Sequence, residues 1–493
     1  MIVGAGAGGL ITALAAAESG AQVAIACGAP LGQDCNTAVS GGGFMMSTDQ
    51  FSVEDHIELT LKAGGFLNDR TLVNILCEQA NEAKTWLESH IGTGFNPKHN
   101  GQGYWFTQGG AGFFEALRQH VCDQSNIELL ESCHIFELAT DDVCHGAWAM
   151  SSNEIFFIQA NATVLATGGY AGIYARHDNP GNPVGSGIAL ALNAGAAVRD
   201  MEFVQFYPLG LAEPTLPTFM AFRPFPPEAK VVNVQGESIP KKYLDTEDLN
   251  EAIGNHRDRF SQAIEVEQQY GPVKLDLTNV DWNHIERWFS LQFLTRYDFP
   301  WQTQAATISP IAHHTMGGIA VDEYGHTSVP NLYAVGEVAS GLHGANRLGS
   351  NSLTECLVFG KRVGIHAVQQ NHSEKIFDLS ANQGSVLDDN TDTNFKKIQW
   401  LCWQYLGLTR NETGIQTAQS SLSELDPPSN IKLKTSCQVA QLVAEFAQRR
   451  TESRGAHQRE DFPDEDAQQQ QSQFAKLKDG KLFFVPDPFQ NNL

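Results

Sequence analysis

The stretch MIVGAGAGGLITALAAAESGAQVAIAC (residues 1–27) decides the fold of this chain. Three apolar residues precede a glycine-rich turn, an alanine-rich segment ends at Gly20, and a second apolar run follows. A short apolar run bounded by turn residues is typical of a buried strand, and glycine commonly ends a helix. The stretch therefore predicts a strand, a helix and a second strand, the βαβ unit of a parallel sheet.

Gly4, Gly6 and Gly9 give the turn the spacing G-x-G-x-x-G. Such glycines let the backbone approach a pyrophosphate, which the amides and dipole of the following helix attract. NAD-binding units carry an acidic residue about 20 positions further on, and this chain offers only Cys27 there. We therefore expect a dinucleotide site without the NAD signature; the alternative is a plain glycine turn between strand and helix.

The composition limits the classes of function. The chain has 493 residues, 42% of them hydrophobic, which is ordinary for an enzyme of two or three domains. No run of about 18 apolar residues predicts a membrane span, and the start resembles no signal peptide. The net charge of −24 argues against nucleic acid as a partner. The nine cysteines lack CxxC or zinc spacing, so we expect a cytoplasmic protein without a metal site.

The residue pattern changes near residue 205, where prolines cluster. The apolar runs typical of buried strands return in VPNLYAVGEVA (residues 329–339). We expect an α/β chain whose first domain spans 1–204 and 307–372, interrupted by an inserted domain at 205–306.

A polar linker is expected in NQGSVLDDNTDTN (residues 382–394). Helical periodicity then predicts a helical C-terminal domain at 390–493. The stretch DEDAQQQQSQ (residues 464–473) within it is expected to be solvated and mobile.

The stretch GLHGANRLGSNSL (residues 341–353) carries the clearest chemical signal. It places His343 and Arg347 among glycines, and these side chains commonly bind a carboxylate or phosphate. Glu337 lies just upstream, at a strand end where a carboxylate can hold ribose hydroxyls. The alternatives are a surface ion pair for Arg347, a core histidine for His343 and a solvent-facing loop acid for Glu337.

Six stretches in the same order resemble one family, the FAD-dependent flavoproteins that comprise fumarate reductase and succinate dehydrogenase flavoprotein subunits and L-aspartate oxidase. These are NTAVSGGGF, TVLATGGY, MEFVQFYP, AHHTMGGIAVD, NLYAVGEVASGLHGANRLGSNSL and RTESRGAHQREDFP. The resemblance implies a Rossmann-like FAD-binding domain interrupted by an α+β capping domain, followed by a helical C-terminal domain. The cap corresponds to the insertion at 205–306.

The resemblance also implies roles for residues. Arg347 would clamp a substrate carboxylate, with His343 and His313 as further anchors, and Arg257 of the cap would transfer the proton. The motif selects His313 over the adjacent His314. The residues expected to contact FAD are Gly4, Gly6, Gly9, Asn36, Thr37, Gly42, Gly43, Thr167, Gly168, Ser186, Glu337, Ser352 and Leu353.

The reaction implied is hydride transfer between flavin and a succinate/fumarate-like dicarboxylate. Electrons would pass to or from a partner protein or oxygen. L-aspartate oxidase is the alternative within the same enzyme class. An alternative of another class is a flavin-binding protein with a catalytically altered cap that serves assembly or sensing.

Several positions depart from the family pattern. Asn36 stands where some members bind FAD covalently through a histidine, so we expect non-covalent FAD. Ser186 replaces an acid, and Tyr207 replaces a histidine. Arg223 and Glu228 stand near the place of an Arg-Gly-Glu-Gly-Gly segment that supplies a relay glutamate. Gln108 replaces the glutamate that aspartate oxidases can pair with the substrate ammonium, which favours a dicarboxylate without an amine.

Overall fold

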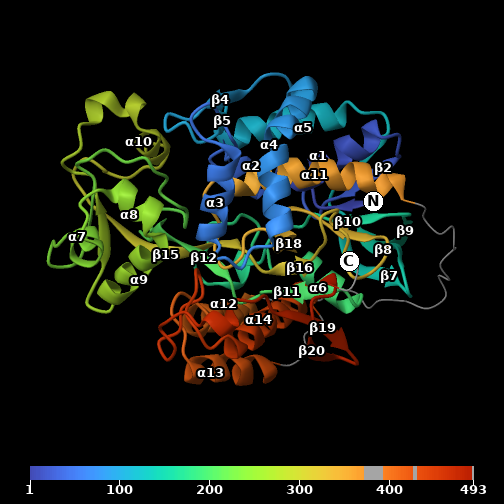
Figure 1. Ribbon diagram of the computed structural model, residues 1–493. Coiled ribbons are helices and arrows are strands. Elements are labelled where there is room, and N and C mark those ends of the chain that lie inside the picture. Colours follow the sequence, from blue (N-terminus) through green and yellow to red (C-terminus); the bar gives the residue numbers. More distant parts are fainter. Residues whose placement is uncertain (371–391, 426–429, 491–493) are drawn as a thin grey trace.

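The computed structural model describes residues 1–370, 392–425 and 430–490 (Figure 1). Most of the expected linker at 382–394 lies outside these ranges. Figure 1 shows the inserted region to one side of the body and the C-terminal helices beneath it. No helix within the described ranges combines the length and apolarity that crossing a membrane requires.

A parallel five-stranded sheet forms the centre of the predicted FAD-binding part. The βαβ unit predicted from residues 1–27 is confirmed, because the first two strands pair in parallel and a helix joins them. One strand of this sheet, β17, comes from the segment after the insertion, which agrees with a domain built from two separate parts. The strands lie in the order β17 (Leu332–Ala334), β10 (Thr163–Leu165), β1 (Ile2–Val3), β2 (Val23–Ala26) and β6 (Ile127–Leu130).

Helices α1 (Ala7–Glu18) and α11 (Asn351–Gln369) join the two parts by packing closely against each other. Small residues make this approach possible. A Cβ added to Gly360 would lie 2.9 Å from Cγ2 of Ile11, and one on Gly364 would lie 2.5 Å from the carbonyl oxygen of Thr12. The helix after the 341–353 motif is therefore fixed against the helix after the glycine loop.

Two small antiparallel sheets and several helices complete this part of the chain. The elements are α2 (Asn36–Val39), α3 (Val53–Ala63), α4 (Arg70–Ile91), α5 (Gly109–Cys122) and α6 (Ser186–Asn193), one sheet of β3 (Gly43–Phe44), β5 (Tyr104–Phe106) and β4 (Phe95–Pro97), and one of β7 (His134–Thr140), β8 (Cys144–Ser151) and β9 (Glu154–Gln159).

The inserted region has its own sheet and its own hydrophobic core, as an α+β cap would. Two long antiparallel strands, β12 (Val204–Leu211) and β15 (Ala306–Thr315), carry the chain into and out of it. The expected boundaries at 205 and 306 stay a prediction. The remaining elements are β13 (Lys230–Val232), β14 (Val273–Asp276), α7 (Ile239–Leu244), α8 (Leu249–Asn255), α9 (Arg257–Gln268) and α10 (Phe289–Leu294).

The C-terminal part contains the expected helices and also a hairpin that the sequence analysis did not predict. The helices are α12 (Asp392–Tyr405), α13 (Glu412–Ser423) and α14 (Ile431–Arg449). The hairpin turns at Asp479–Gly480, both at positive φ, and Asp-Gly is a common hairpin turn. It extends a second sheet in the order β18 (Ala339–Ser340), β16 (Gly318–Ala320), β11 (Val198–Arg199), β19 (Phe474–Lys478) and β20 (Lys481–Val485).

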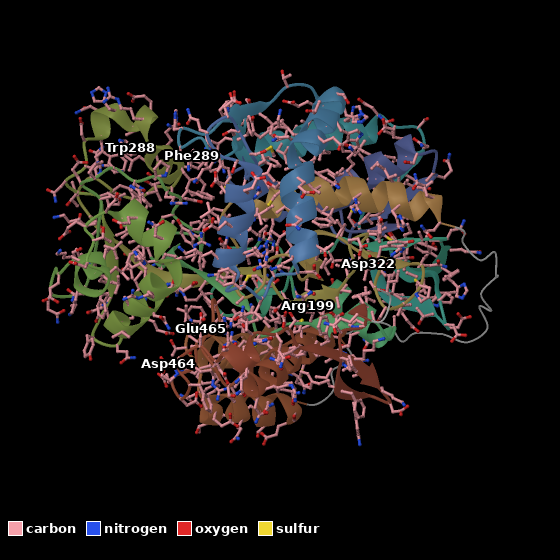
Figure 2. All side chains as sticks on the ribbon, in the orientation of Figure 1. Arg199, Trp288, Phe289, Asp322, Asp464 and Glu465 are labelled. Carbon is pink, nitrogen blue, oxygen red and sulfur yellow. The ribbon has the colours of Figure 1, made fainter. Side chains whose placement is uncertain are left out.

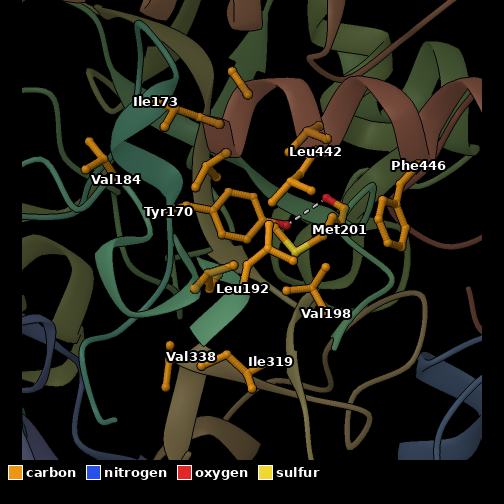
Figure 3. Close-up of a cluster of buried hydrophobic side chains, with 14 of the residues drawn as sticks. Tyr170, Ile173, Val184, Leu192, Val198, Met201, Ile319, Val338, Leu442 and Phe446 are labelled. Atoms are coloured by element: carbon orange, nitrogen blue, oxygen red, sulfur yellow. Dashed lines mark hydrogen bonds between the residues drawn. The ribbon is translucent and has the colours of Figure 1, made fainter. Parts of the chain in front are cut away.

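A buried cluster holds the C-terminal helices against the body (Figure 3). Tyr170 lies within it, and its hydroxyl donates to the carbonyl oxygen of Met201 at 2.7 Å. Leu442 and Phe446 of α14 contribute to the same cluster. Because burying a large apolar side chain stabilises by about 1.5–3 kcal/mol, this contact makes the C-terminal part integral to the fold.

Residues 464–473 are solvated as expected, but contacts that their composition did not indicate hold them to the rest of the C-terminal part; their mobility stays a prediction. Their side chains are mostly exposed, but buried arginines bind them. Arg454 forms an ion pair with Glu465 at 3.1 Å, and Nη1 of Arg450 donates to the carbonyl oxygen of Gln469 at 2.9 Å. Asp464 and Glu465 are labelled in Figure 2. The glutamine run suggested disorder by composition, whereas the arginines that fix it lie upstream in the chain.

Candidate active site

The loop after β1 contains glycines at positions where the Cβ of any other residue would collide with neighbouring backbone atoms. Gly4 has φ +109°, and a Cβ there would lie 2.3 Å from the carbonyl oxygen of Ala166. A Cβ on Gly9 would lie 2.0 Å from the carbonyl oxygen of Gly4. Gly6 is the N-cap of α1 and brings no side chain in front of this helix end. An open glycine loop before a helix N-terminus fits the pyrophosphate of FAD.

Two further predicted segments border this loop. Thr167 follows β10, and Ser186 begins α6. A Cβ on Gly187 would lie 2.2 Å from Oγ1 of Thr167, so these segments touch. The buried Oγ1 of Thr167 has no hydrogen-bond partner among the described residues. Buried polar atoms normally have a partner, and a bound cofactor could provide it. Gly168, at φ +75°, has open space where a Cβ would lie.

Glu337 follows β17 at the same edge of the sheet. Its Oε1 accepts hydrogen bonds from the amide and the hydroxyl of Thr315, at 3.0 and 3.2 Å. Burial raises the pKa of Glu337 to about 7, so near neutrality its carboxyl group can donate as well as accept. The expected contact with ribose hydroxyls stays a prediction.

The structure brings the expected flavin-contacting turns together. A Cβ on Gly42 would lie 2.4 Å from the carbonyl carbon of Gly109, and one on Gly43 would lie 2.8 Å from Oγ of Ser350. The turn at 41–43 therefore lies between the N-termini of α5 and α11. Ser352 and Leu353 form the first turn of α11, with Ser352 half-buried and Leu353 buried.

Asn36 and Thr37 of the short helix α2 contact different parts of the chain. The amide of Ala7 donates to Oγ1 of Thr37 at 3.0 Å, which places Thr37 at the glycine loop. The side chain of Asn36 donates to that of Asn179 at 2.6 Å, and Asn179 donates in turn to the carbonyl oxygen of His313 at 3.0 Å. Asn36 thus connects the expected cofactor residues to an expected substrate anchor.

Arg347 is buried, and its guanidinium forms no ion pair among the described residues. Its Nη2 donates to Oε1 of Gln205 at 2.9 Å, and its Nε has no partner within the described ranges. Burial lowers the pKa of Arg347 to about 10, with a further contribution from Arg257, so it stays charged at neutral pH. A buried charge without an anion is unfavourable. Arg347 is therefore well suited to bind a ligand carboxylate.

Arg257 begins α9 of the cap and reaches the same loop. A Cβ on Gly349 would lie 3.6 Å from its Nη2, and its buried Nε also lacks a partner among the described residues. Burial lowers the pKa of Arg257. The adjacent Asp258 accepts a hydrogen bond from Asn346 at 2.5 Å, and burial raises the pKa of Asp258 to about 6. The cap and the 341–353 loop are thus directly joined.

The expected histidine anchors are each oriented by a carboxylate. Nδ1 of His313 lies 2.8 Å from Oδ2 of Asp178, and Nε2 of His343 lies 3.0 Å from Oε2 of Glu355. Nδ1 of His343 has no partner among the described residues. The buried His314 packs 5.4 Å from the ring of His343, and burial together with neighbouring cations keeps the pKa of His314 well below its ordinary value.

His313 is reached from the cap side. Its ring centre lies 6.0 Å from that of Tyr207, whose hydroxyl donates to the carbonyl oxygen of Ala221 at 3.1 Å. Asp178 and Phe219 line a pocket of about 410 Å³ where the body faces the cap. The side chain of Tyr207 is thus satisfied within the cap.

The remaining departures from the family pattern are exposed side chains. Arg223, Glu228 and Gln108 are all exposed. Gln108 is the N-cap of α5 in the left-handed conformation, at φ 61°. Sequence reasoning missed the orienting roles of Gln205, Asp178 and Glu355. Gln205 and Asp178 act on residues more than 100 positions away, whereas Glu355 lies 12 positions from His343 on α11.

Comparisons with known proteins agree with this geometry. The family described as "FAD binding domain" matches residues 1–353, and "Fumarate reductase flavoprotein C-term" matches residues 426–480. An L-aspartate oxidase of Pseudomonas aeruginosa is 31% identical, covering 94% of this chain and 95% of its own. One subunit of the fumarate reductase (CoM/CoB) of Methanothermobacter marburgensis is 29% identical, covering 94% of each chain.

Among solved structures, the E. coli quinol fumarate reductase superposes with a TM-score of 0.84 and 26% identity, covering 99% of this chain and 96% of that one. The split parallel sheet, the open glycine loop and the cap define an FAD-dependent oxidoreductase. Within that class, the chain belongs to the family of fumarate reductase and succinate dehydrogenase flavoproteins and L-aspartate oxidases.

Proposed function

We propose that this protein transfers a hydride between FAD and a succinate/fumarate-like dicarboxylate. The observation that supports the proposal is the pair formed by the buried Arg347 and the half-buried Arg257, whose guanidinium groups meet at one loop without a carboxylate partner among the described residues. The chain has a net charge of −24 and would repel a dianion. Local cations must therefore reverse the potential at the site.

Substrate binding rests on groups that are already oriented. The planar guanidinium of Arg347 offers two parallel N–H groups to the two oxygens of one carboxylate. Asp178 fixes the ring of His313, and Glu355 fixes the ring of His343. A histidine whose one nitrogen is held by a carboxylate can present its other nitrogen in a defined direction.

Arg257 is proposed to hold the proton that the second carbon gains or loses. FAD, when bound, supplies or accepts the hydride. An exposed arginine hardly releases a proton, whereas burial lowers the pKa of Arg257 and makes the transfer less costly. Asp258, through Asn346, fixes the start of α9 against the 341–353 loop. We propose that FAD is held without a covalent bond, because Asn36 offers an amide in place of a histidine.

L-aspartate oxidation is the second candidate, and the relative named L-aspartate oxidase favours it. The neutral Gln108 weighs against it, because an amide cannot form an ion pair with the substrate ammonium. The cations Arg347 and Arg257 also suit a dianion better than an amino acid.

Anaerobic flavin spectroscopy tests the proposal. The purified protein should carry a flavin that acid precipitation releases. Succinate and L-aspartate would each be added to the oxidised protein, and fumarate to the chemically reduced protein. We expect fumarate to restore the oxidised flavin absorbance, and R257A to abolish this reoxidation while retaining FAD. Bleaching by L-aspartate with no response to fumarate or succinate would establish the second candidate instead.

A further inference from the structure

Lys98 is a buried lysine in the loop between β4 and β5, and only 8% of it is exposed. Its Nζ donates to Oγ of Ser350 at 2.8 Å and lies 4.8 Å from the ring centre of Trp105. Both partners are neutral. No carboxylate forms an ion pair with Lys98 in the part of the chain that the structure describes.

The charged group that shifts the pKa of Lys98 is another cation, the guanidinium of Arg223. Burial, and after it the nearby Arg223 of the cap, lower the pKa of Lys98 to about 7. An ammonium taken out of water without an anion lowers the stability of the folded protein. Sites that bind a ligand commonly retain such unfavourable groups, because the ligand supplies the missing charge.

The position of Lys98 connects it to the substrate site. Ser350 lies three residues after Arg347 and two before Ser352, and the adjacent Gly349 faces Nη2 of Arg257. A Cβ on Gly41 would meet the rings of both Trp105 and Phe222, at 3.6 and 3.9 Å, so the body and the cap meet beside Lys98.

Apart from single hydrogen bonds from the histidine anchors His313 and His343, the second carboxylate of a dicarboxylate has no assigned cation, because Arg257 is proposed to hold the transferred proton. Arg347 can take one carboxylate. At the cap, the Tyr207 hydroxyl is used by the backbone of Ala221, and a neutral phenol binds a carboxylate less strongly than a cation does.

We propose that Lys98 is a substrate-binding residue whose ammonium, positioned by Ser350 and Trp105, binds the carboxylate that Arg347 does not bind. Lys98 thereby selects dicarboxylates over monocarboxylates of the same length. The inference rests on the proposed function, since it takes a dicarboxylate as the ligand.

Lys84 of α4, which packs against the antiparallel strands β4 and β5, offers a matched control for Lys98. Lys84 lies over the rings of Phe95 and Tyr104 of these strands, with its Nζ 5.6 and 5.1 Å from the ring centres. Unlike Lys98, it has a carboxylate partner, Glu88, at 2.8 Å. Replacing either lysine by methionine keeps the apolar stem and removes one charge.

The test measures ligand affinity in the FAD-loaded protein by isothermal titration calorimetry. Malonate and propionate both have three carbons but carry two carboxylates and one, and malonate has no C–C bond that can be desaturated. We expect K98M to weaken malonate binding at least about tenfold, the loss of one charge-assisted hydrogen bond. Propionate affinity should stay within about twofold, K98R should retain most malonate affinity, and K84M should change neither.

FAD content and thermal midpoint are measured on every variant, and K98Q serves as a second neutral variant. Suppose that the wild-type protein prefers malonate and turns over fumarate. If K98M and K98Q then bind malonate as tightly as the wild-type protein does, the inference fails while the proposed function stands. If the wild-type protein shows neither the preference nor the turnover, the proposed function and the inference both fail. A fall in thermal midpoint with unchanged malonate affinity would assign Lys98 a structural role and also overturn the inference.

Discussion

Nδ1 of His313 lies 2.8 Å from Oδ2 of Asp178, although 135 positions separate the two residues. The second pair of this kind, Nδ1 of His326 with Oδ2 of Asp322 at 2.9 Å, lies away from the cap, where Figure 2 labels Asp322. The same side-chain geometry thus occurs in the proposed site and, among the described residues, also outside it, so the Asp322–His326 pair can serve as a control for the pair in the site.

Replacing Asp178 by asparagine should weaken substrate binding. The imidazole would lose the carboxylate that accepts its Nδ1 proton, and the amide could donate to Nδ1 and reverse the tautomer. A hydrogen bond to a charged group contributes about 1.5–3 kcal/mol, so we expect kcat/KM for fumarate to fall about 10- to 100-fold. D322N should leave kcat/KM unchanged. Equal losses in the two variants would contradict an orienting role specific to Asp178.

Arg347 should not tolerate lysine. R347K keeps one positive charge but replaces the planar fork by a single ammonium, so one of two parallel bonds to the carboxylate is lost. We expect kcat/KM to fall about 10- to 100-fold with FAD content unchanged. R362K provides the comparison, since Arg362 lies on α11 and stacks 4.4 Å from the ring of Tyr324 outside the site. Wild-type kinetics in R347K would contradict bidentate binding.

Local sequence signals predicted the βαβ unit and its glycine loop. Gly4, Gly6 and Gly9 lie within one turn, and the strand before them and the helix after them can be read from a few residues. Asp479–Gly480 was also a readable hairpin signal, but its short flanking strands are rich in lysine and lack a clear alternation.

The substrate side depends on contacts between distant segments. Lys98 and Ser350 are 252 positions apart, and Arg347 and Gln205 are 142 apart. Neither Lys98 nor Gln205 stands in a pattern that a single sequence distinguishes from an ordinary polar loop or strand residue. Their contacts, and the roles proposed from them, arise only when distant segments of the chain fold together.

Arg450 should be essential to the stability of the C-terminal part. It pairs with Glu202 and lies 3.1 Å from Glu452, and all three side chains are buried. Removing one partner of a buried ion pair leaves an uncompensated charge and costs about 3–5 kcal/mol. We therefore expect R450M to lower the thermal midpoint by several degrees.

The neighbouring Arg449 is a suitable control for this effect. It is exposed and stacks 4.6 Å from the ring of Phe484, so R449M should change the free energy of unfolding by less than about 1 kcal/mol. The double variant E202M/R450M should recover part of the stability lost in R450M, since it removes both buried charges. Equal midpoints for R450M and R449M would contradict the assigned contribution of the ion pair.

The pH dependence of malonate binding should report the charge of Lys98. Its pKa falls from 10.5 in an exposed lysine to about 7 through burial and the nearby Arg223. The other titratable group coupled to it is His56, whose own pKa burial lowers to about 4 and which is therefore neutral near pH 7. If only the ammonium form binds the second carboxylate, the Kd for malonate should vary little between about pH 6 and pH 7, where malonate is mostly a dianion. Each pH unit above about pH 7 should raise the Kd by up to about tenfold.

The same shift predicts an opposite effect on the ligand-free protein. Between about pH 7 and 10.5 the unfolded chain holds the Lys98 proton and the folded chain does not, so stability rises with pH across this window. K98M should remove both dependences, because methionine does not titrate. K98R should keep malonate binding constant across the window, since arginine stays charged. If the malonate Kd depends on pH in the same way in the wild-type protein and in K98M, a group other than Lys98 causes the pH dependence. Lys98 would then have no direct part in binding.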